Sequence, residues 1–334
     1  MGRIAVLRVA ALLGLAGLAP DTLAATPSAA PAPAREYPQR PIRIIDGFPA
    51  GGGTDFLARV IAQKLTERLG QSVVVDNRPG AAGNIGADLA AKATADGHTL
   101  LMGLTSILAP SATLYPKLPY RLLGDFAYVT LVASGTYILV IHPAVPAKSV
   151  TELIALAKAR PGQLSYGSSG VAGPLHLAVE ILKSRTGADF LHVPYKGAAP
   201  VVAAVTAGEV QLGFASVAAA LPLIKAGRLT ALAVTSAKRA RGFPDLGTIA
   251  EAGFPGFDLT PWYGLMAPAA TPRAIVGRLN AEVGKVLQLA EVDSSFATQG
   301  LEASSSTPER FRQVMQAEVE QWARVIRDAN IKAE

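Results

Sequence analysis

Hydrophobic residues recur along the first third of the chain in a pattern that predicts buried strands separated by helices. Short, mostly β-branched apolar runs at residues 42–45, 73–75 and 99–102 indicate strands. Residues 55–69 and 85–94 lie between these runs and carry apolar side chains at helical spacing. Strands and helices that alternate in this order are typical of βαβ units, in which helices cover both faces of a sheet.

A second series of the same kind begins near Tyr137. Its apolar runs predict strands at residues 138–141, 164–167, 191–193, 211–214 and 229–235. Its helical patterns fall at residues 149–160, 175–186, 198–207 and 217–226. The two series together predict an α/β protein with two lobes, each built on a mostly parallel sheet flanked by helices.

The C-terminal part follows a different pattern. A strand-like run at residues 262–266 is followed by helical segments at 272–289 and 308–329. The last segment has its apolar residues on one face, so it needs a surface on which to pack. No third sheet is predicted, and we therefore expect this helix to pack back onto the first lobe.

Such an arrangement requires the chain to cross twice between the lobes, near residues 132–138 and 257–262. It assigns residues 37–136 and 258–334 to lobe 1, and residues 137–257 to lobe 2. Two crossings form a hinge about which two lobes can close.

The first 25 residues predict the cellular compartment. Arg3 and Arg8 give a positive start, an apolar run covers residues 9–18, and small residues follow up to Ala24 and Ala25. This is the layout of a secretory signal peptide cleaved near Ala24 or Ala25, and the apolar run is too short to span a bilayer. The alternative is an N-terminal membrane anchor or a buried helix. Residues 26–36 are rich in Pro and Ala and predict a disordered leader, so we expect a periplasmic protein folded from residue 37.

Composition argues against several classes of protein. The chain has no cysteine, and therefore no disulfide, no thiolate metal site and no acylated anchor. Its formal net charge of +6 favours anionic partners. Basic residues are scattered apart from a cluster at 238–241, and no aromatic residues alternate with them, which argues against nucleic acid as a partner.

A glycine-rich turn at residues 48–55 joins the first predicted strand to the first helix. Three consecutive glycines allow the backbone to approach a ligand, and the free N–H groups of the helix start attract a carboxylate or phosphate. Thr54 or Asp55 is expected to cap the helix. The turn is neither a P-loop nor a dinucleotide fingerprint, because no Gly-Lys-Ser/Thr follows and Phe56 replaces the third glycine. The alternative is a tight turn without a ligand.

Other turns follow predicted strands in the same way, and ligands of open α/β sheets bind at the carboxyl ends of strands. In the turn at residues 77–86, Arg78 could pair with an anion or brace the loop, and bracing is the favoured interpretation. His176 lies in the first turn of its helix, where it either touches the ligand or packs in the core. The candidate ligand-binding residues are Phe48, Gly51, Gly52, Gly53, Thr54, Asp55, Ala81, Ala82, Gly83, Thr105, Ser106, Ser169, Gly170, Val171, Ala172, His176, Tyr195 and Ser216.

Few residues of the chain are arranged for catalysis. None of the four histidines is spaced as a zinc pair, and no Gly-x-Ser-x-Gly elbow is present. An enzyme built on these lobes would have only Tyr195, Lys196 and His176 as candidate catalytic groups. The sequence therefore predicts a binding protein with no catalytic residue, no metal and no cofactor.

Several ordered motifs carry a resemblance to a known family. They lie at residues 41–44, 48–55, 74–83, 96–101, 192–197, 232–236 and 251–257, within a match that runs from about Tyr37 to Ile331. With these motifs the chain resembles the Bug family of periplasmic receptors, the solute-binding components of tripartite tricarboxylate transporters. The resemblance implies a type II-like periplasmic-binding-protein fold that closes on a small carboxylate, held by main-chain groups and water. It also implies a monomer that delivers its ligand to membrane permease subunits. A sensor that presents its closed form to a histidine kinase is the alternative.

The chain departs from the family pattern at three places. Gly170-Val171-Ala172-Gly173 replaces the usual Gly-x-Gly-Ser, which removes one hydroxyl from the expected ligand contacts. Ala215 stands where an aspartate is common, which argues against amino-acid ligands. Leu246-Gly247-Thr248 replaces Val-Pro-Thr and is interpreted as a change in a loop only.

Overall fold

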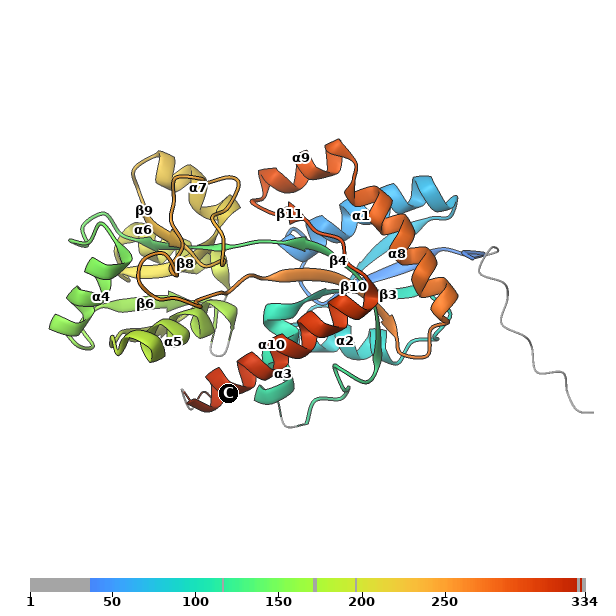
Figure 1. Cartoon of the computed structure of the whole chain (residues 1–334), viewed down its shortest axis with the longest axis horizontal. Coiled ribbons are helices and arrows are strands. Elements are labelled where there is room, and N and C mark those ends of the chain that lie inside the picture. Colours follow the sequence, from blue (N-terminus) through green and yellow to red (C-terminus); the bar gives the residue numbers. More distant parts are fainter. Residues whose placement is uncertain (1–36, 116, 171–172, 196, 329–330, 332–334) are drawn as a thin grey trace, which may run out of the picture. The chain divides into compact units, whose positions relative to one another are not determined.

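Two separate sheets contain the strands of the part of the chain that the structure describes. The structure is a computed structural model, and it describes residues 37–115, 117–170, 173–195, 197–328 and 331 (Figure 1). Sheet A has the order β11-β4-β10-β3-β1-β2 and sheet B the order β7-β6-β8-β5-β9. The strands of sheet A are β1 (Ile42–Asp46), β2 (Val73–Asn77), β3 (Thr99–Leu104), β4 (Phe126–Ser134), β10 (Trp262–Pro268) and β11 (Glu302–Ala303). Those of sheet B are β5 (Tyr137–Ile141), β6 (Ser165–Ser168), β7 (Leu191–Pro194), β8 (Leu212–Ser216) and β9 (Thr230–Val234).

Helices accompany both sheets. With sheet A the chain forms α1 (Gly53–Leu69), the short 3₁₀ helix η1 (Ala81–Gly83), α2 (Asn84–Ala91), α3 (Thr105–Leu114), α8 (Arg273–Leu287), α9 (Ala290–Thr298) and α10 (Pro308–Asp328). With sheet B it forms α4 (Val150–Ala159), α5 (Pro174–Thr186), α6 (Ala198–Ala207) and α7 (Val217–Lys225). The predicted α/β fold with two helix-flanked sheets is confirmed. No helix among the described residues has the length and the apolar character needed to cross a membrane.

Most strands of each sheet run in one direction, as predicted, but each sheet is mixed because it also contains antiparallel strands. β1 pairs in parallel with β2 and β3, and β6 pairs in parallel with β7 and β8. β10 is antiparallel to β3 and β4, and β5 is antiparallel to β8 and β9. The strands that run against the others include β5, by which the chain enters sheet B, and β10, by which it returns to sheet A. β4 and β5 are separated by only Gly135 and Thr136, so the chain passes from sheet A to sheet B without an intervening helix.

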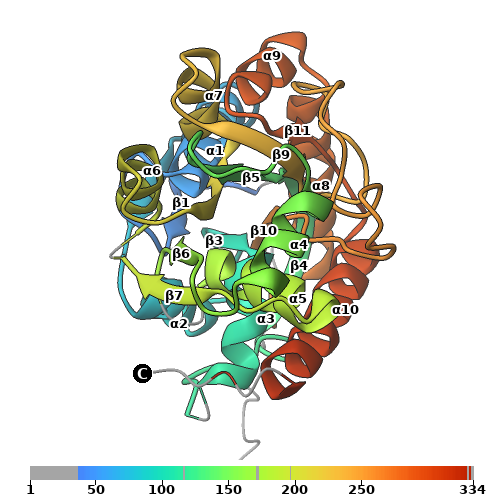
Figure 2. The ribbon, with the colours of Figure 1, turned by 90° about the vertical axis from the view of Figure 1, so that its left-hand side faces the viewer.

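Alternate residues of each central strand face opposite layers of the core. In β5, Leu139 and Ile141 pack in a cluster with residues of α4 and α5, whereas Ile138 and Val140 pack with residues of α6 and α7. Figure 2 shows these two pairs of helices on the two sides of sheet B. Side chains of a strand alternate with a period of two, so this burial on both faces accounts for the continuous apolar runs in the sequence.

The two connections between the sheets lie side by side and are hydrogen-bonded to each other. Gly135 N–H donates to the carbonyl of Pro261 at 3.0 Å. The hydroxyl of Thr235 accepts from Tyr137 N–H at 3.0 Å and donates to the carbonyl of Leu259 at 2.8 Å. The chain thus passes between the sheets at two points that are joined at Thr235.

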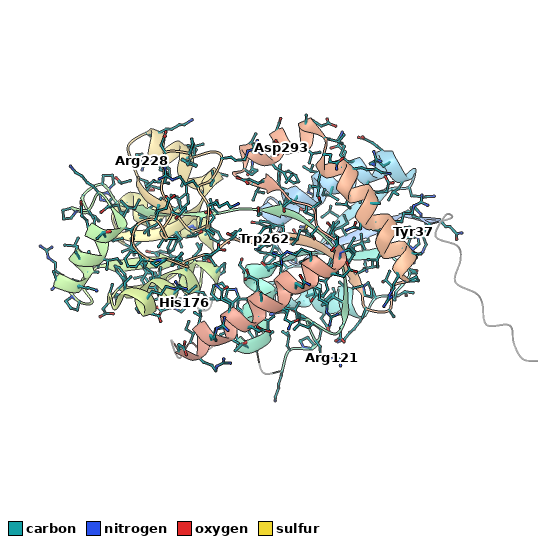
Figure 3. The ribbon with its side chains drawn as sticks, in the orientation of Figure 1. Tyr37, Arg121, His176, Arg228, Trp262 and Asp293 are labelled. Carbon is teal, nitrogen blue, oxygen red and sulfur yellow. The ribbon has the colours of Figure 1, made fainter. Side chains whose placement is uncertain are left out.

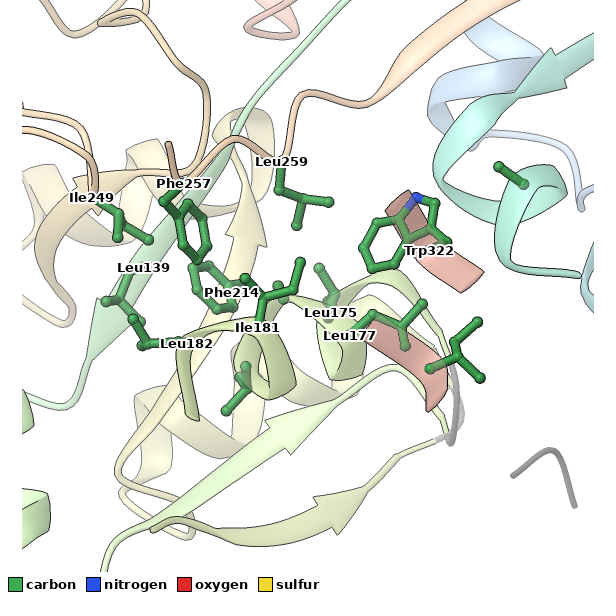
Figure 4. Packing of buried hydrophobic residues seen from close by; sticks show 14 of the residues in the cluster. Leu139, Leu175, Leu177, Ile181, Leu182, Phe214, Ile249, Phe257, Leu259 and Trp322 are labelled. Atoms are coloured by element: carbon green, nitrogen blue, oxygen red, sulfur yellow. The ribbon is translucent and has the colours of Figure 1, made fainter. Parts of the chain in front are cut away.

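α10 packs against α3, as expected for a helix that returns to the first sheet, and also against α5 beside sheet B. Trp322 on α10 is fully buried and belongs to the cluster that contains Leu175 and Leu177 of α5 and Leu259 of the second connection (Figure 4). The indole N–H donates to Glu318 Oε2 at 2.8 Å. One apolar cluster therefore extends from α10 into the layer beneath sheet B.

Candidate ligand-binding site

The parallel strands bring the predicted turns together at one edge of each sheet. β1 lies between β2 and β3 in sheet A, and β6 lies between β7 and β8 in sheet B. Because each trio is parallel, the segments that follow its strands emerge at the same edge. The candidate residues thus fall into two groups, one at the carboxyl edge of each sheet.

In the first group, helix α1 begins at Gly53 without a side-chain cap. Gly52 is the N-cap residue in an extended conformation, and its carbonyl accepts the first helical hydrogen bond, from Phe56 N–H at 2.9 Å. The expectation that Thr54 or Asp55 caps the helix is therefore wrong. The N–H groups of Gly53, Thr54 and Asp55 take part in no hydrogen bond among the described residues. They are donors at the positive end of a helix dipole.

A buried polar network holds this turn in place. Thr54 donates its hydroxyl proton to Asp46 Oδ2 at 3.2 Å, and Phe48 N–H donates to Asp46 Oδ1 at 3.2 Å. The Asn77 amide donates to Asp46 Oδ2, to the Phe48 carbonyl and to Asp55 Oδ1 at 3.0–3.2 Å. The side chains of Thr54 and Asp55 are thus used inside the protein, and only their main-chain groups remain for a ligand.

The pKa values of the two carboxyl groups in this network are shifted in opposite directions. Burial raises the pKa of Asp46 to about 6, although hydrogen bonds from Thr54 and Phe48 oppose it. Burial also acts to raise the pKa of Asp55, but hydrogen bonds from Arg59, Gly51 N–H and Asn77 outweigh it and lower the pKa. Arg59 Nε lies 2.9 Å from Asp55 Oδ2. The negative charge behind the turn is therefore largely compensated, which is compatible with an anionic ligand in front of it.

The second turn of sheet A has an unusual backbone. Four consecutive residues, Gly80, Ala81, Ala82 and Gly83, have φ values of 137°, 46°, 52° and 83°. Positive φ is uncommon for alanine, and such conformations concentrate at functional sites. The N–H groups of Ala81 and Ala82 form no hydrogen bond within the described part of the chain. Both residues are exposed, so these donors are accessible.

Glycines hold the two turns of sheet A against each other. A Cβ atom on Gly47 would lie 2.7 Å from the carbonyl oxygen of Gly83, and one on Gly86 would lie 2.8 Å from Gly47 Cα. These distances leave no room for a side chain. Gly47, Gly83 and Gly86 therefore form a contact in which backbone packs on backbone, and the contact fixes the spacing of the turns.

The third segment of sheet A is the start of α3. Thr105 and Ser106 are buried, and the Thr105 hydroxyl accepts from Trp262 N–H at 3.3 Å. The Ser106 hydroxyl forms no hydrogen bond of ordinary geometry with the described residues, but it lies near Tyr137. Burial raises the pKa of Tyr137 to about 12, and the Ser106 hydroxyl opposes this shift. Figure 3 shows Trp262 between the elements of the two sheets.

The second group of candidates lies at the edge of sheet B. Ser169, Gly170 and Tyr195 are half-buried, and Ser216 is exposed at the start of α7. Val171 and Ala172 lie outside the described residues.

His176 is nearly fully buried within α5 (Figure 3). Its ring stacks on that of His192, with the centroids 4.1 Å apart. Among the described candidates, the buried side chains are those of Thr54, Asp55, Thr105, Ser106 and His176, whereas the glycine-rich turns present main-chain donors.

Some residues that organise the site were not identified from the sequence. Asp46, Asn77 and Arg59 brace the first turn, and Gly47 sets the distance between the turns. Asp46 and Asn77 are partners in the register of β1 and β2. In the sequence each comes one or two residues after a predicted strand, and this position is the signal that could have connected them.

Comparison with known proteins identifies the relatives of this architecture. The family model described as "Tripartite tricarboxylate transporter family receptor" matches residues 57–331. Protein BugT of Bordetella pertussis is 41% identical over 305 residues, which cover 91% of this chain and 94% of that protein.

Solved structures give the same result. A Rhodopseudomonas palustris protein with adipate is 38% identical, with a TM-score of 0.80 over 89% of this chain and 99% of the other. The R. palustris protein MatC, solved with bound malate, is 30% identical, with a TM-score of 0.76 over 87% of this chain and all of the other. The periplasmic binding protein BugD is also 30% identical, with a TM-score of 0.76 over 89% of this chain and all of the other. The two-lobe periplasmic-binding-protein fold is confirmed, and the chain belongs to the tripartite tricarboxylate transporter receptor family, which includes the Bug proteins.

Proposed function

We propose that this protein is a periplasmic receptor that binds a small organic carboxylate and delivers it to the permease of a tripartite tricarboxylate transporter. The observation that carries the proposal is the set of main-chain N–H groups at the start of α1 and in the turn at Ala81 and Ala82. These donors lie at one sheet edge and have no partners among the described residues. A carboxylate has two oxygens with several acceptor sites, so it can satisfy donors from both turns at once.

The structures of relatives support this class of ligand. Adipate and malate, the ligands named for two R. palustris proteins, are both small dicarboxylic acids. In this chain Arg78 pairs with Asp76 at 2.9 Å, in agreement with a bracing role rather than a role as a ligand clamp. We infer that recognition depends on main-chain donors and ordered water, a mode that accepts carboxylates of different length.

The chain division that we propose for closure places residues 37–136 and 258–334 in lobe 1 and residues 137–257 in lobe 2. The ligand would contact the turns of sheet A first and would favour the closed state through the turns of sheet B. The hinge would be the two hydrogen-bonded connections around Thr235. We further propose that residues 1–25 are a signal peptide and that the mature protein acts as a monomer without enzymatic activity.

A thermal-shift screen of mono-, di- and tricarboxylates on the mature chain tests this proposal. A ligand present at 100 times its Kd is expected to add about 2.7 kcal/mol to the unfolding free energy. Small-angle X-ray scattering should then show a smaller radius of gyration in the presence of the best ligand, as the lobes close. The absence of any stabilising carboxylate would contradict the proposed ligand class, and an unchanged scattering profile with bound ligand would contradict closure.

A further inference from the structure

A cluster of polar and aromatic residues lies directly behind the turn that follows β6. Ser168 is the last residue of β6 and is fully buried. Its hydroxyl oxygen lies 2.6 Å from His192 Nε2, 3.1 Å from the carbonyl oxygen of Gly170 and 3.3 Å from Gly170 N. Gly170 has φ 126°, a conformation that suits glycine alone. One hydroxyl group thus connects a histidine to the turn through both main-chain groups of Gly170.

The hydroxyl has only one proton to share between two acceptors. When His192 Nε2 carries a proton, the ring donates to Ser168 Oγ, and the hydroxyl proton is free to bond the Gly170 carbonyl. When Nε2 carries no proton, the hydroxyl donates to the ring, and the Gly170 carbonyl loses that donor. The 2.6 Å separation shows that the serine and histidine are bonded in either case. The protonation of His192 therefore decides how many hydrogen bonds hold Gly170.

Stacked rings keep His192 in this position. His176 of α5 lies parallel to it, with an interplanar angle of 3° and centroids 4.1 Å apart. Tyr166 lies against it at 4.8 Å and 19°, and the Tyr166 hydroxyl donates to Glu180 Oε1 at 2.9 Å. Two stacked rings cannot both carry a positive charge at this distance without strong repulsion. A positive charge on one ring of the stack therefore disfavours a charge on the other.

Two charged side chains of α5 lie beside His176. Glu180 Oε1 lies 3.8 Å from His176 Nε2 and 3.1 Å from Lys183 Nζ, so the carboxylate and the ammonium largely cancel. Burial, followed by the charge of His192, lowers the pKa of His176 to about 4. His176 is accordingly the neutral member of the pair at neutral pH.

We propose that Ser168 is a positioning residue for the ligand turn at Ser169 and Gly170, and that the proton on His192 Nε2 controls how firmly Ser168 holds it. This inference rests on the proposed function, because the turn is a proposed ligand contact. A charged ring always carries a proton on Nε2, whereas a neutral ring with its proton on Nδ1 does not, so carboxylate affinity should rise as the pH falls from 8 to 6.

Binding of adipate, measured by calorimetry between pH 6 and pH 8, tests the proposal with a set of matched variants. Ser168→Ala and His192→Phe remove the bond and should weaken binding by roughly tenfold, the effect of one lost hydrogen bond. His192→Gln keeps an amide that does not titrate, and should restore binding but with a flat pH profile. His142→Gln changes a histidine outside the cluster and should behave as the wild type. Wild-type affinity and pH profile in both Ser168→Ala and His192→Phe would overturn the proposal.

Nuclear magnetic resonance of the ligand-free protein separates this inference from the proposed function. In the wild type, the Gly170 amide resonance should titrate with the same midpoint as the ring nitrogens of His192, and in His192→Gln it should not titrate. Equal titration of Gly170 in both proteins, or a titrating His192 with an invariant Gly170, would contradict the proposal. A protein that binds no carboxylate but shows the coupled titration would refute the proposed function and leave the serine–histidine brace supported.

Discussion

Glu318 provides the most quantitative prediction of the structure. Glu318 is half-buried on α10, and the indole N–H of Trp322 donates to its Oε2 at 2.8 Å. Burial raises the pKa of Glu318 to about 7, with a further rise from Asp258, although the bond from Trp322 opposes it. In the unfolded chain the pKa returns to its ordinary value near 4.5.

The sign of the pH effect follows from these two values. Between pH 4.5 and 7 the folded protein binds the proton that the unfolded chain releases. The stability that this proton contributes is fully present below pH 4.5 and is lost as the pH rises through 7. At 1.36 kcal/mol for each pH unit, the loss amounts to about 3 kcal/mol. Glu318→Gln has no proton to lose, and its amide oxygen can still accept from Trp322.

Urea denaturation at pH 5 and pH 8 measures this difference. We expect the unfolding free energy of Glu318→Gln, relative to the wild type, to be higher at pH 8 than at pH 5 by about 2.5 kcal/mol, because part of the loss has already occurred at pH 5. Glu320→Gln is the matched control, because Glu320 lies on the same helix and is exposed. Equal pH dependence in the wild type and in Glu318→Gln would refute the proton-binding state of Glu318.

Three further changes test other parts of the structure. Gly47→Ala places a Cβ atom 2.7 Å from the Gly83 carbonyl oxygen, so it should separate the two turns of sheet A. Calorimetry should then show carboxylate binding weakened at least tenfold, and unchanged affinity would contradict the role of this contact. Ala82→Glu adds a negative charge beside the exposed N–H groups of η1 and should weaken binding of adipate, whereas normal binding would show that this turn does not face the ligand. Burial lowers the pKa of His176 to about 4, so the folded protein loses stability as the pH falls from 6.5 to 4. Urea denaturation should show that this loss is larger in the wild type than in His176→Gln, by up to about 3 kcal/mol. Parallel pH curves of the two proteins would contradict this.

Strands and helices with uninterrupted patterns were predictable to within a few residues. The prediction of a helix at residues 55–69 corresponds to α1 (Gly53–Leu69), and that of a helix at 308–329 to α10 (Pro308–Asp328). In both cases a single apolar face is enough to define the element.

Elements that depend on tertiary packing were missed. α3 contains Pro110 and begins with Thr105 and Ser106, a composition that does not favour a helix, but it packs closely against α10. β4 lies between β10 and β11 and is buried along most of its length, so its sequence shows no alternation of apolar and polar residues. Its end was therefore interpreted only as part of the crossing between lobes.

In the candidate site, too, some features could be predicted from the sequence and others depend on tertiary packing. Glycines at positions 51–53 and 83 identified the turns, and Gly51 and Gly83 have positive φ values that few other residues adopt. The brace formed by Asp46 and Asn77 depends on the register of β1 and β2, and the contact of Gly47 with Gly83 depends on the packing of two turns. Neither can be deduced from the order of residues along the chain.

Calorimetric titration of a Gly52 variant tests the central claim most directly. Gly52 has an ordinary extended backbone, and a Cβ atom there would meet only the Pro49 carbonyl at 3.6 Å, so Gly52→Val is compatible with the fold. Gly242→Val is the control, because a Cβ atom at Gly242 lies in open space. We predict that the wild type and Gly242→Val bind one molecule of adipate, or of the best carboxylate from the screen, and that Gly52→Val binds none at unchanged thermal stability. Wild-type affinity in Gly52→Val would show that the start of α1 is not the carboxylate site.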